Sequence, residues 1–172
     1  MNPLALVPAE VLGVDIGGVL TDHRRLHHDQ SEAVFLSKYL ETPEQEGAFE
    51  ILRLLVECSF GKHVYLVSRC KRRTEEVTRK WLIHRDFYNR TGILPEHIFF
   101  CLERAEKADI CRRLGVTHFV DDRLEIHGYL EGIVKHRFLF RPSEKEVAEF
   151  VHVLPGVRRV ESWVELLGAL YH

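Results

Sequence analysis

Residues 11–18 read Val-Leu-Gly-Val-Asp-Ile-Gly-Gly, an apolar run that leads into a carboxylate and two adjacent glycines. Continuous apolar runs of this length are typical of strands that are buried on both faces of a parallel sheet. Similar runs recur at 63–68, 97–101, 117–121 and 134–140. The stretch therefore predicts the first strand of a parallel sheet, with Asp15 near its carboxyl end.

Segments with helical spacing lie between these runs. In the first of them, apolar side chains recur at intervals of three and four residues after Thr42-Pro43, and Gly61 closes the pattern. Strands that alternate with helices predict an α/β protein whose five-stranded, mainly parallel sheet has helices on both faces. The expected helices span about 43–61, 72–87 and 105–114, and two more begin at the N-cap residues Ser143 and Ser162.

The length and composition fit one globular domain over residues 1–172. Hydrophobic residues make up 45% of the chain and charged residues 29%, which excludes wholesale disorder and collagen-like repeats. The formal net charge is −2, which excludes a uniformly basic nucleic-acid-binding surface but leaves a local basic patch open.

Nothing in the sequence indicates a membrane or secreted protein. No apolar run reaches the roughly 18 residues that a membrane span needs, and residues 1–10 contain no Lys or Arg of the kind that opens a signal peptide. The four cysteines form no Cys-x-x-Cys pair, and we expect them to be reduced. These features predict a cytoplasmic protein.

Polar side chains follow three of the predicted strands. Asp15 ends the first strand, Ser68 the second, and Asp121-Asp122 the fourth, while Lys107 precedes the fourth strand. Because ligands bind at the carboxyl ends of strands in open parallel sheets, we expect these groups to converge at one edge. The carboxylates can hold Mg²⁺, and the hydroxyl and the ammonium can hold a phosphate. One carboxylate could instead act as a nucleophile.

In this order the stretches resemble the haloacid dehalogenase-like (HAD) hydrolase superfamily. The first family motif, an apolar strand followed by Asp-x-Asp-Gly-Val/Thr-Leu, is similar to residues 11–22. The second, an apolar strand ending in Ser or Thr, corresponds to 64–68, and the third, a lysine, to Lys107. The fourth, an acidic pair after an apolar strand, corresponds to 119–122. The resemblance covers about residues 10–140 and implies a Rossmann-like HAD fold.

The resemblance also implies roles. In the family the first Asp becomes phosphorylated, and Mg²⁺ screens the repulsion between this anionic nucleophile and the phosphate. The implied catalytic residues are Asp15, Ser68 and Lys107; the implied substrate-binding residues are Gly18, Ser68, Arg69 and Lys107; and the implied metal ligands are Asp15, Gly17 through its carbonyl, Asp121 and Asp122.

Gly17 departs from the family pattern. Most HAD phosphatases have a second Asp at this position, which protonates the leaving alcohol and then deprotonates the hydrolytic water. General acid–base catalysis is typically worth about 10²–10⁴ in rate. Three interpretations remain open. The chain is a slow phosphatase, or Asp22 or His23 substitutes for the missing acid, or the domain binds a phosphorylated ligand or a protein partner without turnover.

The spacing of the motifs leaves little room for a cap. About twenty residues separate Leu20 from Pro43, so we expect no large cap domain and at most a small helical flap at about 24–41. An open site suits a large or macromolecular phosphorylated substrate, or a partner that completes the pocket. The partners that the resemblance implies are a phosphorylated small molecule or a nucleotide, with a nucleic-acid end as a further candidate. The late segment 138–163 is weakly similar to that of the 5′(3′)-deoxyribonucleotidases. Oligomeric state stays open.

A basic segment follows Ser68. Residues 69–90 contain eight Lys or Arg residues and three acidic ones. One interpretation is a solvated helix face whose interleaved aromatic side chains lie in the core. The other is a surface for the phosphates of a nucleotide or nucleic acid.

Overall fold

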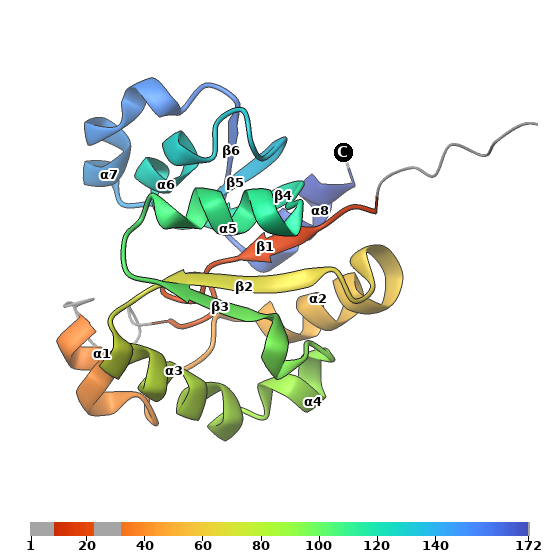
Figure 1. Ribbon diagram of the computed structural model, residues 1–172, viewed down its shortest axis with the longest axis vertical. Coiled ribbons are helices and arrows are strands. Elements are labelled where there is room, and N and C mark those ends of the chain that lie inside the picture. Colours follow the sequence, from red (N-terminus) through yellow and green to blue (C-terminus); the bar gives the residue numbers. More distant parts are fainter. Residues whose placement is uncertain (1–8, 23–31, 172) are drawn as a thin grey trace, which may run out of the picture.

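The computed structural model describes residues 9–22 and 32–171, with the backbone alone at 32–34. Six parallel strands form one sheet in the order β3-β2-β1-β4-β5-β6, with β1 and β4 at its centre (Figure 1). The α/β architecture with a parallel sheet is thereby confirmed. The strands are β1 Leu12–Val14, β2 Val64–Arg69, β3 Ile98–Cys101, β4 His118–Asp121, β5 His136–Phe140 and β6 Val157–Val160.

The sheet has six strands rather than the five expected from the sequence. The additional strand, β6, lies at the edge and pairs with β5 alone. Its sequence is Val-Arg-Arg-Val, and both arginines are exposed to solvent. An edge strand need not be apolar on both faces, so a search for continuous apolar runs overlooks it.

Helices cover both faces of the sheet, as expected (Figure 1). On one face, Leu12, Val14 and Leu66 pack against α2, α3, α4 and α8 in the main hydrophobic core. On the other face, Val67 and Phe119 pack against α5 and α6. The helices are α1 Glu32–Lys38, α2 Ala48–Leu55, α3 Arg72–His84, α4 Phe87–Thr91, α5 Glu106–Leu114, α6 Leu124–Tyr129, α7 Glu144–Glu149 and α8 Trp163–Leu170; α2 continues as a π-helical turn, Val56–Phe60, and short 3₁₀ turns lie at Pro95–His97 and Val151–Val153.

The helix expected to begin at Thr42-Pro43 begins at Ala48 instead. The segment before it pairs with the loop that follows β1: Thr21 and Glu44 form an antiparallel bridge. The amide of Asp22 donates to the Pro43 carbonyl at 2.8 Å, and the Gln45 amide donates to the Leu20 carbonyl at 2.7 Å. Long-range pairing therefore holds residues 43–45 out of the helix.

The helix expected over 72–87 is two helices. Asp86 adopts a left-handed conformation, with φ of 54°, and separates α3 from α4. The helix expected over 105–114 corresponds to α5, which ends at Gly115. Both predicted serine caps are confirmed, because the hydroxyls of Ser143 and Ser162 accept hydrogen bonds from backbone amides three residues later.

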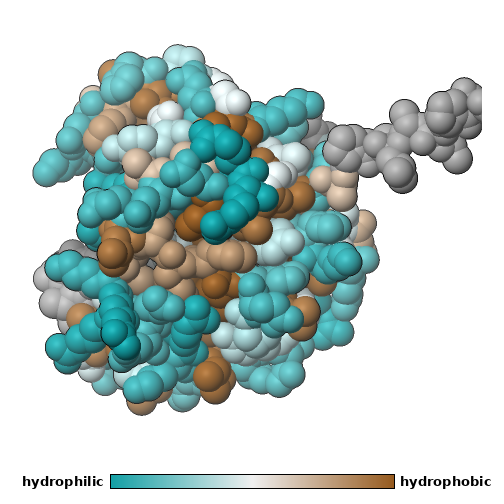
Figure 2. Space-filling view, in the orientation of Figure 1, coloured by the Kyte–Doolittle hydropathy of each residue, from teal (hydrophilic) through white to brown (hydrophobic). Residues whose placement is uncertain are grey.

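The surface shown in Figure 2 is mostly hydrophilic, with a hydrophobic band over the edge strand β3. Within residues 9–22 and 32–171, no helix has the length and apolar character that crossing a membrane requires. All four cysteines are free thiols, as expected; Cys58 is exposed, and Cys70, Cys101 and Cys111 are buried.

Candidate active site

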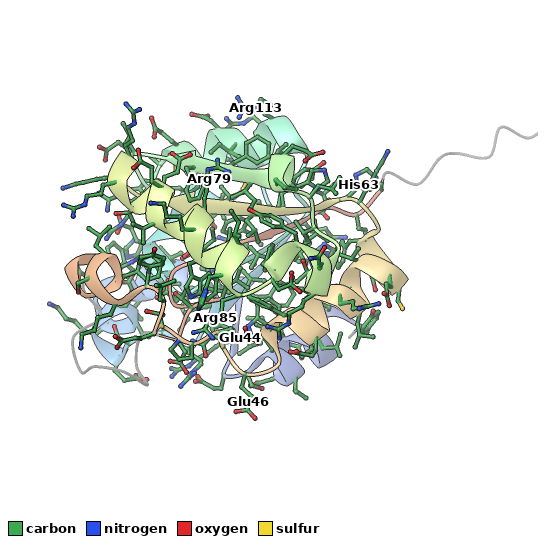
Figure 3. All side chains as sticks on the ribbon, turned by 90° about the horizontal axis from the view of Figure 1, so that it is seen from below. Glu44, Glu46, His63, Arg79, Arg85 and Arg113 are labelled. Atoms are coloured by element: carbon green, nitrogen blue, oxygen red, sulfur yellow. The ribbon has the colours of Figure 1, made fainter. Side chains whose placement is uncertain are left out.

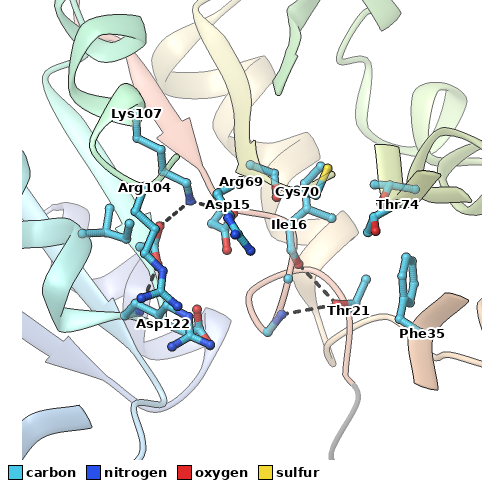
Figure 4. A pocket seen from close by; sticks show the side chains of 17 residues that line it. Asp15, Ile16, Thr21, Phe35, Arg69, Cys70, Thr74, Arg104, Lys107 and Asp122 are labelled. Carbon is cyan, nitrogen blue, oxygen red and sulfur yellow. Dashed lines mark hydrogen bonds and ion pairs between the residues drawn. The ribbon is translucent and has the colours of Figure 1, made fainter. Parts of the chain in front are cut away.

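The carboxyl ends of the central strands surround a pocket of about 230 Å³ (Figure 4). The parallel arrangement explains this, because β1, β2 and β4 all deliver their last side chains to the same edge. The structure thus brings together every site residue expected from the sequence: the pocket is lined by Asp15, Gly17, Gly18, Ser68, Arg69, Lys107, Asp121 and Asp122.

Lys107 forms the centre of the charge network in this pocket. Its buried ammonium donates to Asp15 Oδ1 at 2.8 Å and to Asp121 Oδ2 at 2.7 Å. The two carboxylates raise the pKa of Lys107 above its usual value against the opposing effect of burial. Burial raises the pKa of Asp15, and the Asp121 carboxylate adds to this effect while Lys107 opposes it. Lys107 thereby fixes one oxygen of Asp15 and leaves Oδ2 on the side of Gly17.

The two members of the acidic pair have different surroundings. Asp121 is fully buried, and its two carboxylate oxygens accept from Lys107 and from the Arg123 amide. Asp122 is partly exposed, and no residue in the described ranges donates a hydrogen bond to its carboxylate. Burial and the nearby carboxylates of Asp121 and Asp15 raise the pKa of Asp122 to about 8. Asp122 is therefore the member of the pair whose oxygens are available to a ligand.

The donor set suits a hard divalent cation. One carboxylate oxygen each from Asp15, Asp121 and Asp122 lies within 4.8 Å of the others. Three carboxylates surround a single ammonium, so a cation at this position would relieve their mutual repulsion. Oxygen-only donors are those that Mg²⁺ prefers.

The two glycines after Asp15 differ in what they can accommodate. A Cβ on Gly18 would lie 2.6 Å from Asp122 Oδ2, and its φ of 77° is left-handed, so this position requires glycine. A Cβ on Gly17 would meet only Asp15 Oδ2, at 4.0 Å, with no left-handed φ. The absence of a side chain at position 17 is therefore not imposed by packing.

The turn that follows Asp15 is held from outside the pocket. Gln45 is buried and donates through Nε2 to the Gly18 carbonyl at 3.0 Å and to the Thr21 carbonyl at 3.5 Å. The Oε1 of Gln45 in turn accepts from Arg141 Nη1 at 2.8 Å. Arg141 follows β5 and has a left-handed φ of 43°, which is costly for arginine. Gln45 and Arg141 thus support the turn after Asp15 without lining the pocket.

Several pocket residues are missed by the sequence motifs. Arg104 and Arg123 follow β3 and β4, so the rule that strand ends gather at one edge could have found them. Thr74 and Thr78 lie on one face of α3, four residues apart, and Phe35 comes from α1. The contributions of Phe35 and of Gln45 depend on long-range contacts, which no local pattern indicates.

Asp22, one proposed substitute for the missing acid, does not line this pocket. It lies beside Gln45 and Arg141 in a separate depression, with its carboxylate 4.0 Å from the Arg141 guanidinium. His23 lies outside the described residues. The structure thus places Asp22 outside the pocket that contains Asp15.

Most of the basic segment contacts the protein itself. Arg79 pairs with Glu75 on α3, Arg85 donates to the Thr42 carbonyl, and Arg90 pairs with Glu44. In Figure 3, Arg85 extends toward the segment that carries Glu44. Among the basic residues of 69–90, Arg69 alone lines the pocket.

Comparison with solved structures identifies the architecture. The structure of D,D-heptose 1,7-bisphosphate phosphatase from B. bronchiseptica, complexed with magnesium and phosphate, superimposes with a TM-score of 0.68; the match covers 94% of this chain and 98% of that one. This chain has the HAD-like hydrolase fold. The identity to that enzyme is 18%, so the likeness establishes the fold, in agreement with the resemblance of the four motifs.

Other structural neighbours share the HAD-like fold. D,D-heptose 1,7-bisphosphate phosphatase from Burkholderia thailandensis matches with a TM-score of 0.63 at 14% identity, over 94% of this chain and 98% of its own. A HAD family hydrolase from Deinococcus radiodurans R1, with bound phosphate and sodium, matches with a TM-score of 0.62 at 17% identity, over 95% of both chains.

Sequence comparison gives a weaker match. A protein of Oceanobacillus iheyensis named “Putative nucleotidase OB0422” is 25% identical over 100 residues, which are 58% of this chain. The chain thus spans about half of that relative, 48% of its length. No family model matches the chain.

Proposed function

We propose that this chain is a Mg²⁺-dependent phosphomonoester hydrolase with Asp15 as its nucleophile. The observation that carries the proposal is the position of Asp15: its carboxylate lines an open pocket, and one of its oxygens is fixed by the buried ammonium of Lys107. The names of the structural neighbours, phosphatases and a HAD family hydrolase, support the same chemistry.

In the first step Asp15 Oδ2 attacks the phosphorus, and the P–O bond to the leaving alcohol breaks. The product is an aspartyl-phosphate, and water then attacks its phosphorus and releases Asp15 and phosphate. Lys107 and the Ser68 hydroxyl hold phosphoryl oxygens, because both groups face the pocket beside Asp15. Lys107 also favours the ionised form of Asp15, since the ammonium opposes the effect of burial, which raises the pKa of this carboxyl.

Asp15, the Gly17 carbonyl and Asp122 are the groups we assign to hold Mg²⁺, with Asp121 in a supporting position. When bound, the ion supplies positive charge that screens the repulsion between the nucleophile and the phosphate. Asp121 is assigned the lesser role because Lys107 and the Arg123 amide already occupy its oxygens.

Gly17 makes the enzyme slow toward poor leaving groups. No side chain at this position can protonate a departing alkoxide, and Asp22 lies outside the pocket. We therefore expect aryl phosphates, which leave with little protonation, to react faster than alkyl phosphates.

The test is a phosphatase assay with p-nitrophenyl phosphate and a panel of nucleotides, with and without Mg²⁺. We expect activity that requires Mg²⁺ and that Asp15→Asn abolishes. Asp109→Asn is the matched control, because Asp109 is exposed on α5 and should leave the rate unchanged. Activity that persists in Asp15→Asn would refute the assignment.

A second candidate function is a domain that binds a phosphorylated ligand without turnover, and Gly17 is the observation that favours it.

The small helical flap expected at about 24–41 also stays a proposal. Residues 23–31 lie outside the described residues, while α1 falls within this range and contributes Phe35 to the pocket.

A further inference from the structure

The mouth of the pocket is basic, in contrast to its acidic floor. Arg69 is the last residue of β2, Arg104 follows β3 and Arg123 follows β4, and all three line the pocket. In Figure 4, Arg104 lies beside Asp122, and Arg69 lies between Lys107 and Cys70. A single scissile phosphate already has Lys107 and Ser68 at the floor, so the arginines at the mouth need a separate explanation.

The three arginines differ in how their charge is balanced. Arg104 forms an ion pair with Glu125, and Arg123 lies 3.6 Å from the carboxylate of Glu146. Within the ranges that the structure describes, Arg69 has no carboxylate partner. Its Nε donates to the Leu102 carbonyl at 2.9 Å, which fixes the plane of the guanidinium. The two terminal nitrogens of Arg69 thus form no ion pair within the described residues.

The size of the pocket determines what reaches Arg69. A volume of about 230 Å³ is smaller than pockets that enclose drug-sized ligands, roughly 300–1,000 Å³. A small phosphorylated molecule whose ester group lies on Asp15 therefore extends its other end to the mouth. The pocket is also lined by Thr74, Thr78 and Phe35, which can contact a hydroxylated carbon skeleton.

We infer that Arg69 is a specificity-determining residue that binds a second anionic group, a phosphate or a carboxylate, at the end of the substrate away from the scissile ester. The inference rests on the proposed function of the site and narrows its substrates to small phosphomonoesters that carry a second anionic group. A guanidinium matches the paired oxygens of either group through two parallel hydrogen bonds.

The experiment measures binding rather than turnover, in the Asp15→Asn background with Mg²⁺ present. Calorimetry compares two matched pairs: fructose 6-phosphate with fructose 1,6-bisphosphate, and glycerol 3-phosphate with 3-phosphoglycerate. In at least one pair we expect the member with the second anionic group, fructose 1,6-bisphosphate or 3-phosphoglycerate, to bind on the order of tenfold more tightly, as for a hydrogen bond between charged groups. The first pair reports on a second phosphate and the second on a carboxylate.

Variants assign the effect to one side chain. Arg69→Met should abolish the difference within the pair, and Arg69→Lys should retain part of it because charge remains without the planar fork. Arg72→Met is the matched control: Arg72 lies three residues away, is 92% exposed and does not line the pocket, so the difference should persist.

Three results would each overturn the inference. They are equal affinities within both pairs, a difference that survives Arg69→Met, and no measurable binding of any of the four compounds. Its failure is distinguishable from that of the proposed function. A protein that hydrolyses p-nitrophenyl phosphate but binds all four compounds alike retains the function and loses the inference. A protein that discriminates within a pair but hydrolyses nothing retains the inferred role of Arg69 and loses the proposed function.

Discussion

Replacing Gly17 with aspartate tests whether the pocket lacks only a general acid. The substitution fits sterically, because the new Cβ would lie 4.0 Å from Asp15 Oδ2, an ordinary contact, and no left-handed backbone opposes it. Gly17→Asp should therefore fold as the parent does. The same change at Gly18 would place a Cβ 2.6 Å from Asp122 and would disrupt the site.

The effect can be estimated from the same geometry. A carboxylate on this Cβ would lie about 5 Å from the Asp15 carboxylate, and two like charges at that distance repel by about 3 kcal/mol at an effective dielectric of about 20. This corresponds to about 2 pKa units, so the pKa of the new carboxyl would rise to about 6, near the optimum for a proton donor at neutral pH. We expect kcat to increase on the order of 10² for alkyl phosphates.

The assay compares an alkyl phosphate with p-nitrophenyl phosphate in the parent, Gly17→Asp and Gly17→Asn. The gain should be large for the alkyl ester, small for the aryl ester, and absent in Gly17→Asn, which matches the size but not the acidity. An equal gain in Gly17→Asn, or no gain in a parent that is already active, would refute the reasoning. The second result would show that another group already acts as the acid.

Two further predictions concern the surroundings of the site. Gln45→Leu removes the donor to the Gly18 carbonyl and keeps a side chain of similar size. We expect kcat to fall about tenfold with little change in KM, as for a lost hydrogen bond of about 1.4 kcal/mol. A larger change in KM than in kcat would contradict a positioning role for Gln45. For His118, burial and the nearby His136 lower the pKa to about 4. The unfolded chain takes up this proton near pH 6.5, so the free energy of unfolding should fall by up to about 3 kcal/mol as the pH drops from 6.5 to 4. Urea unfolding of His118→Phe should show a smaller loss over this range, and an unchanged slope would exclude His118 as the cause.

The predictable part of the site consists of residues that follow buried apolar runs. Asp15, Ser68 and Asp121 lie at or next to the carboxyl ends of buried strands, so their convergence follows from the rule for parallel sheets. Lys107 was identified by its place before the fourth strand, and its ion pairs with Asp15 and Asp121 explain why a lysine is fully buried there.

The features that local sequence patterns did not predict depend on contacts between residues far apart in the sequence. Residues 43–45 have a reasonable helix start, yet pairing with residues 20–22 holds them extended. Gln45 and Arg141 are 96 residues apart, and their shared support of the turn after Asp15 leaves no periodic signal in the sequence. The strand β6 was not predicted because its two arginines are exposed to solvent at the sheet edge, which interrupts the apolar pattern.

The two tryptophans of the chain have a consequence for experiments. Both are almost fully buried; the Trp163 indole donates to the Val19 carbonyl, and the Trp81 indole donates to the Thr42 carbonyl. One indole therefore binds the backbone within the turn after Asp15, and the other binds the backbone at Thr42, shortly before α2. The tryptophan fluorescence of the unlabelled protein thus originates at these two backbone contacts. Ligand-induced movement of the backbone at Val19 or at Thr42 would change the emission.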